Sequence, residues 1–194
     1  MQRDNLVDSK TSIEIVGTYL RLLRARFSGA NDGIPWQWSP NREEATIIVE
    51  SGKNEFEETI DSKPAIFVER NAIVFPTIAI GNKVAEHLPT GTSYYYTTPS
   101  GQMTIDCISR SRGESSTIAD AVAHHIVMSG NILRRFYGFK QITPVTLMPS
   151  QVWEKDDRNY ITRVTSEFVY DIAWKSVPEE LIIRRMRGLE ITSD

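Results

Sequence analysis

The sequence predicts an α+β fold, with an antiparallel or mixed β-sheet, two main helices packed on one face and a long C-terminal β-hairpin. Three observations lead to this prediction. Apolar residues recur with helical spacing in two separate stretches, residues 11–27 and 115–137. Strand-like segments fill much of the chain between and after these stretches. The last of them, residues 160–174, alternates between apolar and polar side chains almost residue by residue.

The first helix is predicted over residues 11–27. Thr11 and Glu14 match a capping box, in which each side chain accepts a hydrogen bond from an otherwise unpaired backbone N–H. Gly29 is a suitable stop signal. The residues that form the apolar stripe are Ile13, Val16, Leu20, Leu23 and Phe27.

A loop follows over residues 29–41, and it contains two tryptophans between two prolines. Trp36 and Trp38 lie between Pro35 and Pro40, which excludes a helix because proline lacks a backbone donor and restricts the residue before it. On an extended segment both indoles point the same way. Two interpretations stay open: a lid over the core, or a contact patch on another chain.

The central region is predicted to be β-rich. Residues 46–50 form a short strand and residues 64–74 one or two more. Residues 94–97 and 102–110 flank a turn over 98–101, and this arrangement predicts a hairpin. Alternation in the second of these strands places Cys107 toward the core.

The second helix is predicted to begin near Ser115 or Ser116, either of which can cap it, and to end at Gly138. Residues 141–153 are then expected to pair with the long terminal strand across a charged tip at 154–159. The predicted buried stripe of this helix comprises Ile118, Val122, Ile126, Ser129, Leu133 and Phe136.

The terminal strand is unusually long. Fifteen residues at about 3.3 Å each span roughly 50 Å, whereas a compact domain of this length is only about 40 Å across. We therefore expect part of the strand to be covered by another subunit. Its apolar face carries Val164, Phe168, Tyr170, Ile172 and Trp174.

Composition predicts one domain over residues 1–194, soluble and made in the cytoplasm. The chain is 40% hydrophobic and 24% charged, which is ordinary for a domain with a real core. A polar N-terminus and the lack of any apolar run of membrane-spanning length predict neither a secretory signal nor a membrane partner. A net charge of -3 argues against a surface that binds nucleic acid through its phosphates.

Catalytic chemistry finds little support in the sequence. His124 and His125 are adjacent on a predicted helix, about 100° apart, so they cannot both face one metal from that helix. Cys107 is expected to be buried, and Asp156 with Asp157 occupies a solvated turn. Phosphate-binding glycine motifs are missing. The sequence therefore predicts no enzyme, no catalytic residue, no cofactor and no metal.

The order of elements resembles that of bacteriophage tail-terminator and neck proteins of the head-to-tail junction. The resemblance rests on the strand end at residues 105–110, the helix carrying residues 119–121, the closing hairpin through 168–174 and the loop at 34–40 followed by 46–50. It implies a small α+β virion protein, assembled in the host cytoplasm into a ring, usually sixfold, that closes the tail tube and joins it to the connector.

The same resemblance implies partners and interface residues. The partners are identical copies, a connector, adaptor or stopper ring, and tail tube or sheath proteins, while DNA passes through the lumen without specific binding. Residues predicted to contact another subunit or ring are Trp36, Trp38, Asp156, Asp157, Phe168, Tyr170 and Trp174.

Three alternatives remain. A head-closure, tail-tube or baseplate subunit shares the same logic of assembly. A small-ligand-binding or hydrolytic cytosolic domain predicts instead a concave site with converging polar groups. A host-directed binding module, monomeric until it meets its target, is a third alternative.

Overall fold

A computed structural model describes residues 12–29, 34–52, 63–77, 82–87, 91–154 and 156–176. The chain divides into two compact units. The larger unit comprises Lys10–Val74 and Ser100–Tyr170, and the small-sheet unit comprises Met1–Ser9, Phe75–Pro99 and Asp171–Asp194. Helices and a mainly antiparallel sheet confirm the predicted α+β class. The single domain expected over 1–194 stays a prediction.

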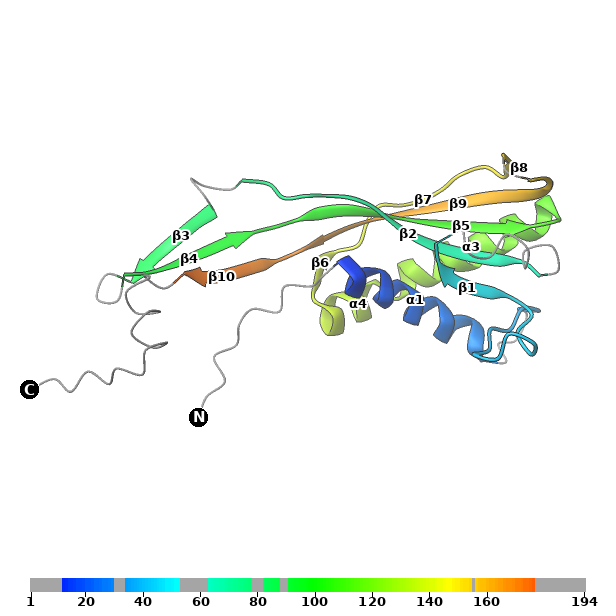
Figure 1. The fold of residues 1–194 in the computed structure, drawn as a ribbon, viewed down its shortest axis with the longest axis horizontal. Helices are drawn as coiled ribbons and strands as arrows, with labels where there is room; N and C mark the ends of the chain where they lie inside the picture. Colours follow the sequence, from blue (N-terminus) through cyan, green and yellow to red (C-terminus); the bar gives the residue numbers. More distant parts are fainter. Residues whose placement is uncertain are drawn as a thin grey trace, which may run out of the picture. The chain divides into compact units, whose positions relative to one another are not determined.

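The larger unit is built on a seven-stranded sheet (Figure 1). The strand order is β1-β2-β5-β9-β6, with β7 and β8 also paired with β9. Only the β1–β2 pair is parallel among the described pairs. The strands are β1 (Ile48–Ser51), β2 (Ala65–Val74), β5 (Ser100–Ser109), β6 (Phe139–Gln141), β7 (Val145–Leu147), β8 (Gln151–Trp153) and β9 (Asp156–Tyr170).

Three described helices belong to this unit: α1 (Ser12–Ser28), α3 (Arg112–Met128) and α4 (Gly130–Tyr137). The Tyr19 hydroxyl of α1 lies 3.0 Å from Ser166 Oγ, and Ser115 Oγ of α3 lies 3.0 Å from Thr162 Oγ1. Because Thr162 and Ser166 are four positions apart on β9, they share one face of the sheet. Helices α1 and α3 therefore cover the same face, as predicted.

The opposite face also buries side chains. A cluster of Ile48, Ala65, Phe67, Ile108, Trp153 and Ile161 packs there. Asp106 and Arg163 are direct partners across β5 and β9 on this face and form a salt bridge at 2.7 Å. Both faces of the middle of β9 are consequently buried, and its length is covered by strands of its own unit.

The small-sheet unit contains a three-stranded antiparallel sheet in the order β10-β4-β3. Its strands are β3 (Lys83–His87), β4 (Thr92–Thr97) and β10 (Ile172–Ser176). Tyr96 donates a hydrogen bond to Asp171 Oδ1 at 2.7 Å, and Thr97 donates to the Pro76 carbonyl at 2.8 Å. These contacts hold the connecting residues to the sheet.

The predicted hairpin across residues 98–101 is wrong. Strand β4 pairs with β3 and β10, whereas β5 pairs with β2 and β9. Thr97 is opposite Ile172 and Ser100 is opposite Val169, so the strands on either side of the proline bind consecutive parts of one partner segment. The proline therefore interrupts a strand at this point and does not reverse it.

The second predicted helix is two helices. Helix α3 begins at Arg112, where Ser111 accepts a hydrogen bond from the Glu114 backbone and acts as the N-cap in place of Ser115 or Ser116. Ser129 ends α3, and α4 follows at once. Gly138 terminates α4 with a positive φ of 65°, as predicted, because glycine carries no Cβ that would oppose this conformation.

Candidate assembly surfaces

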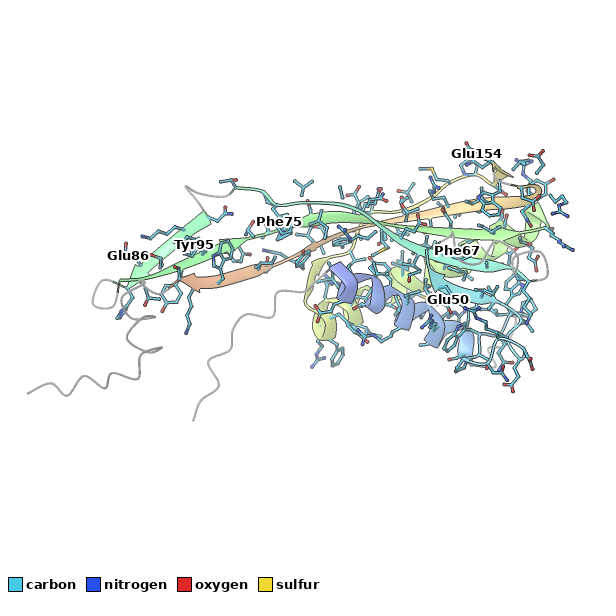
Figure 2. All side chains as sticks on the ribbon, in the orientation of Figure 1. Glu50, Phe67, Phe75, Glu86, Tyr95 and Glu154 are labelled. Carbon is cyan, nitrogen blue, oxygen red and sulfur yellow. The ribbon has the colours of Figure 1, made fainter. Side chains whose placement is uncertain are left out.

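The small sheet exposes most of its side chains. Every residue of β3 is exposed, and so are Tyr94 and Trp174 on the other strands. Figure 2 places the labelled Tyr95 and Glu86 on this sheet. A sheet normally gains its stability by burying one apolar face. In the described strands of this unit only Thr97 is buried, so the sheet is a candidate surface for contact with another chain.

Trp174, predicted to lie at an interface, is on this sheet. Its ring stacks on Tyr95, the residue directly opposite on β4, with ring centroids 5.2 Å apart and planes 8° apart. The side chain remains 39% exposed. Stacking fixes the orientation of the indole, and the exposed part of the ring is available to a partner.

Phe168 and Tyr170 have a different environment from the one predicted. Both are buried in the larger unit, where Phe168 contacts the rings of Phe139 and Tyr170 at centroid distances of 5.8 and 6.2 Å. Strand β9 is enclosed by its neighbours along this stretch, so these side chains fill the core of their own subunit. Burial in their own unit leaves neither side chain accessible to a second copy.

The two aspartates of the hairpin tip differ in role. Asp156 accepts hydrogen bonds from the Arg158 backbone and side chain and from Asn159 Nδ2. The Arg158 hydrogen bonds hold the pKa of Asp156 below its ordinary value. Asp157 is exposed. Asp156 thus stabilises the turn, and Asp157 is the residue that presents charge at the tip.

The tryptophan loop is bound to its own unit. Trp36 Nε1 donates to Glu114 Oε1 at 2.9 Å, and Glu114 also accepts from Ser109 Oγ. The Arg24 guanidinium lies 5.1 Å from the centroid of the Trp38 ring. Both indoles are half-buried. The hydrogen bond and the cation contact favour the lid interpretation, while a contact with another chain stays a prediction.

Helix α4 presents an apolar surface that the sequence analysis missed. Phe136 was expected in the buried stripe, but it is 73% exposed, and Leu133 is the buried residue of α4. The predicted buried stripe holds through Ser129 and Leu133, and of its members only Phe136 is exposed. Ile132 and Met128 are exposed one and two turns before Phe136.

A cavity of about 280 Å³ lies beside the tryptophan loop. Its cations are Arg24, Arg42 and Lys63. Arg24 is held by Glu50 at 2.7 Å, and Lys63 Nζ donates to the Arg42 carbonyl at 2.6 Å. Ligand sites are usually about 300 to 1,000 Å³ with a few convergent polar groups. This cavity is at the lower limit, and its cations already have partners.

The reactive side chains among the described residues have environments that suit structural roles. Burial, with a smaller effect of Asp106, raises the pKa of Cys107 far above its ordinary value, so the thiol is not activated. Burial also raises the pKa of Tyr19 to about 12. In the described ranges, no group of three or more His, Cys, Asp or Glu could hold a metal ion, and no helix is long and apolar enough to cross a membrane.

Comparison with known proteins leaves the family open. No protein-family model matches the chain, and no curated protein matches it.

Proposed function

We propose that this protein is a structural subunit that assembles with copies of itself into a ring at the head-to-tail junction of a bacteriophage. The small sheet is the observation that supports self-assembly most directly. Its described strands leave Val84, Tyr94 and Trp174 in solvent and give β3 no buried residue. Exposed apolar residues on a sheet whose described strands bury so little are typical of a surface that another chain covers.

The edges of this sheet support the same proposal. Strands β10 and β3 are its outer strands, and each has one described strand partner. An outer strand leaves one row of backbone donors and acceptors for pairing with another chain. Such a surface suits a ring, because in a ring one face of each subunit contacts a different face of the next subunit.

The position in the virion rests on the resemblance described above. The resemblance implies that the ring contacts a connector, adaptor or stopper ring on one side and tail tube or sheath proteins on the other. A net charge of -3 suits a lumen that DNA passes without being held. A head-closure, tail-tube or baseplate subunit would assemble through the same kind of contact between copies. Electron microscopy of particles carrying a tagged chain distinguishes these positions.

Size-exclusion chromatography with light scattering, together with native mass spectrometry, tests the self-assembly. The wild-type chain should form a closed ring of several copies. Val84→Ser with Tyr94→Ser should leave folded monomers with the wild-type circular dichroism spectrum, because both side chains are already exposed within one chain. Glu43→Ala, an exposed residue of the larger unit, is the control. A wild-type chain that stays monomeric with and without its partner ring contradicts the proposal.

A small-ligand-binding domain is the second candidate, and the cavity beside Trp38 is the observation in its favour. A ligand bound there stabilises the folded chain in proportion to the logarithm of its concentration once the site is saturated. Thermal unfolding in the presence of small anions and aromatic acids measures this effect. A monomeric protein with ligand-dependent stabilisation, lost in Trp38→Ala, would support this candidate over the ring.

A further inference from the structure

A row of large apolar side chains is exposed where α3 passes into α4. Met128, Ile132 and Phe136 follow one another at four-residue spacing, and we call this row the α4 face. Met128 is 81% and Phe136 73% exposed, the two highest values among the large apolar residues described. Backbone hydrogen bonds of the helical type run through Ser129, so the three side chains lie on one side of the helical stretch. Water is an unfavourable environment for such a row, and a partner that covers it is stabilised.

Three guanidinium groups accompany this row without a carboxylate partner. The Arg135 guanidinium lies 5.7 Å from the centroid of the Phe136 ring. Arg134 donates to two neutral oxygens of its own helix. Arg21 of α1 lies 5.8 Å from the centroid of the Tyr137 ring. None of these three arginines forms an ion pair with a carboxylate in the described part of the chain.

The carboxylates of the helical layer lie farther from the row. Residues 121–153 contain no Asp and no Glu. Asp120 precedes Met128 by eight residues, which is about 12 Å along a helix. Glu14 precedes Arg21 by seven residues, or about 10 Å along α1. The charge beside the α4 face is therefore positive, and a complementary surface combines apolar groups with anions.

An anionic lipid bilayer has this combination. Its acyl boundary accepts protruding apolar side chains without preformed pockets, and its headgroup phosphates attract cations at the surface. When the Phe136 ring enters the acyl boundary, the adjacent Arg135 guanidinium remains at the level of the headgroups. Nucleic acid supplies phosphates but leaves the apolar row uncovered. A protein partner needs a shaped pocket for each protruding side chain.

We propose that the α4 face binds the surface of an anionic lipid bilayer. Met128, Ile132 and Phe136 enter the acyl boundary, and the three guanidinium groups contact the phosphates. The row covers about 12 Å of helix, so the contact is peripheral. The sequence predicted no membrane partner because no apolar run of spanning length exists, and a peripheral contact needs no such run. The contact does not depend on the proposed ring, although a ring would strengthen it by presenting several copies to one membrane.

Vesicle flotation with the full-length chain tests this contact. Binding is expected to phosphatidylcholine vesicles that contain about 30% phosphatidylglycerol and not to pure phosphatidylcholine, because the guanidinium groups need anionic headgroups. Ile132→Ser with Phe136→Ser should lower the partition coefficient by about tenfold or more, and Arg134→Gln with Arg135→Gln should do the same. All four side chains are exposed, so circular dichroism should show folded variants.

Matched variants elsewhere in the larger unit are the controls. Leu147→Ser with Val152→Ser removes two exposed apolar side chains, and Arg42→Gln with Arg110→Gln removes two exposed cations. Neither pair should change vesicle binding. Light scattering on the same samples establishes that the compared chains have equal oligomeric states, since a change in the number of copies alters binding on its own.

A fluorescent label measures insertion directly. Ile132→Cys carrying nitrobenzoxadiazole should shift its emission to the blue with the anionic vesicles, and labelled Glu43→Cys should not. Cys107 is buried and stays unlabelled. Equal binding to both kinds of vesicle, binding that survives loss of the apolar pair, or an unshifted label overturns the lipid contact. A ring that binds no vesicle overturns the lipid contact alone, whereas a monomer that binds the anionic vesicles through the α4 face overturns the ring alone.

Discussion

Arg163 donates to both carboxylate oxygens of Asp106, its direct partner across β5 and β9, at 2.7 and 3.2 Å. Asp106 has no exposed surface, whereas the Arg163 side chain is 42% exposed. The hydrogen bonds to Asp106 are the main reason that the pKa of Arg163 is raised. The partly exposed Arg163 guanidinium therefore compensates the charge of the buried Asp106 carboxylate.

Replacing Arg163 with methionine should lower the free energy of unfolding by about 2 to 3 kcal/mol, because it leaves a buried carboxylate without its main partner. Urea denaturation measures the loss. The double variant Arg163→Met with Asp106→Leu should recover most of it, because neither charge is then buried. Equal losses in the single and double variants would show that the pair contributes little beyond side-chain packing.

Gly101 is required by the close approach of Phe168. A Cβ at Gly101 would lie 2.7 Å from Phe168 Cζ and 3.2 Å from Ile73 Cγ1. Gly101→Ala should therefore destabilise the larger unit by about 1 to 3 kcal/mol. Gly17→Ala is the matched control, since no atom lies within 4 Å of its added Cβ. In the interior of α1 this change should stabilise the protein by about 0.5 to 1 kcal/mol, and thermal unfolding compares the two variants.

Sequence reasoning located the helices and strands in which buried and exposed residues alternate with a regular period. Strand β9 is recognisable because Val164 and Phe168 are buried while Glu167 is exposed. That another subunit covers part of residues 160–174 stays a prediction: Ile172–Ser176 leave the larger unit as β10, whereas β9 is enclosed by its own unit for a reason that the pattern did not show. Thr165 and Ile161, on the other face, are buried as well, and three short strands cover an edge that the pattern does not describe.

Contacts between distant residues were beyond sequence reasoning. Trp36 meets Glu114, and Asp106 meets Arg163, only after strand register and helix position are set by packing of the whole unit. Met128, Ile132 and Phe136 form a second apolar row at four-residue spacing beside the buried row that ends at Leu133, and the spacing alone does not tell which row is exposed. Phe136, three residues after Leu133 and four after Ile132, fits either row, so it was assigned to the core and the exposed apolar surface of α4 was missed.

Acid should weaken the contact between α1 and α3 through His125. Burial lowers the pKa of His125, and the nearby Arg26 adds to this, although a hydrogen bond with the Leu22 backbone partly opposes it. Below about pH 6.5 the unfolded chain gains a proton that the folded chain excludes, so stability falls as pH decreases toward the folded pKa. His125→Gln should flatten this part of the profile. Urea denaturation between about pH 8 and pH 5 measures the difference between wild type and variant, and a difference that is constant with pH contradicts the prediction.

Trp36→Phe separates the two interpretations of the tryptophan loop. The change keeps an aromatic ring but removes the N–H that Glu114 accepts. If the loop is a lid, the free energy of unfolding should fall by about 1.5 kcal/mol, because a hydrogen bond to a charged group is lost, while assembly is unchanged. Trp38→Phe is the comparison, since this change keeps a ring for Arg24 to contact. An interface predicts the reverse: weaker assembly in light scattering and an unchanged unfolding midpoint at protein concentrations too low for assembly. The hydrogen bond to Glu114 favours the first outcome, because a side chain anchored to α3 of its own subunit has little freedom to reach another subunit.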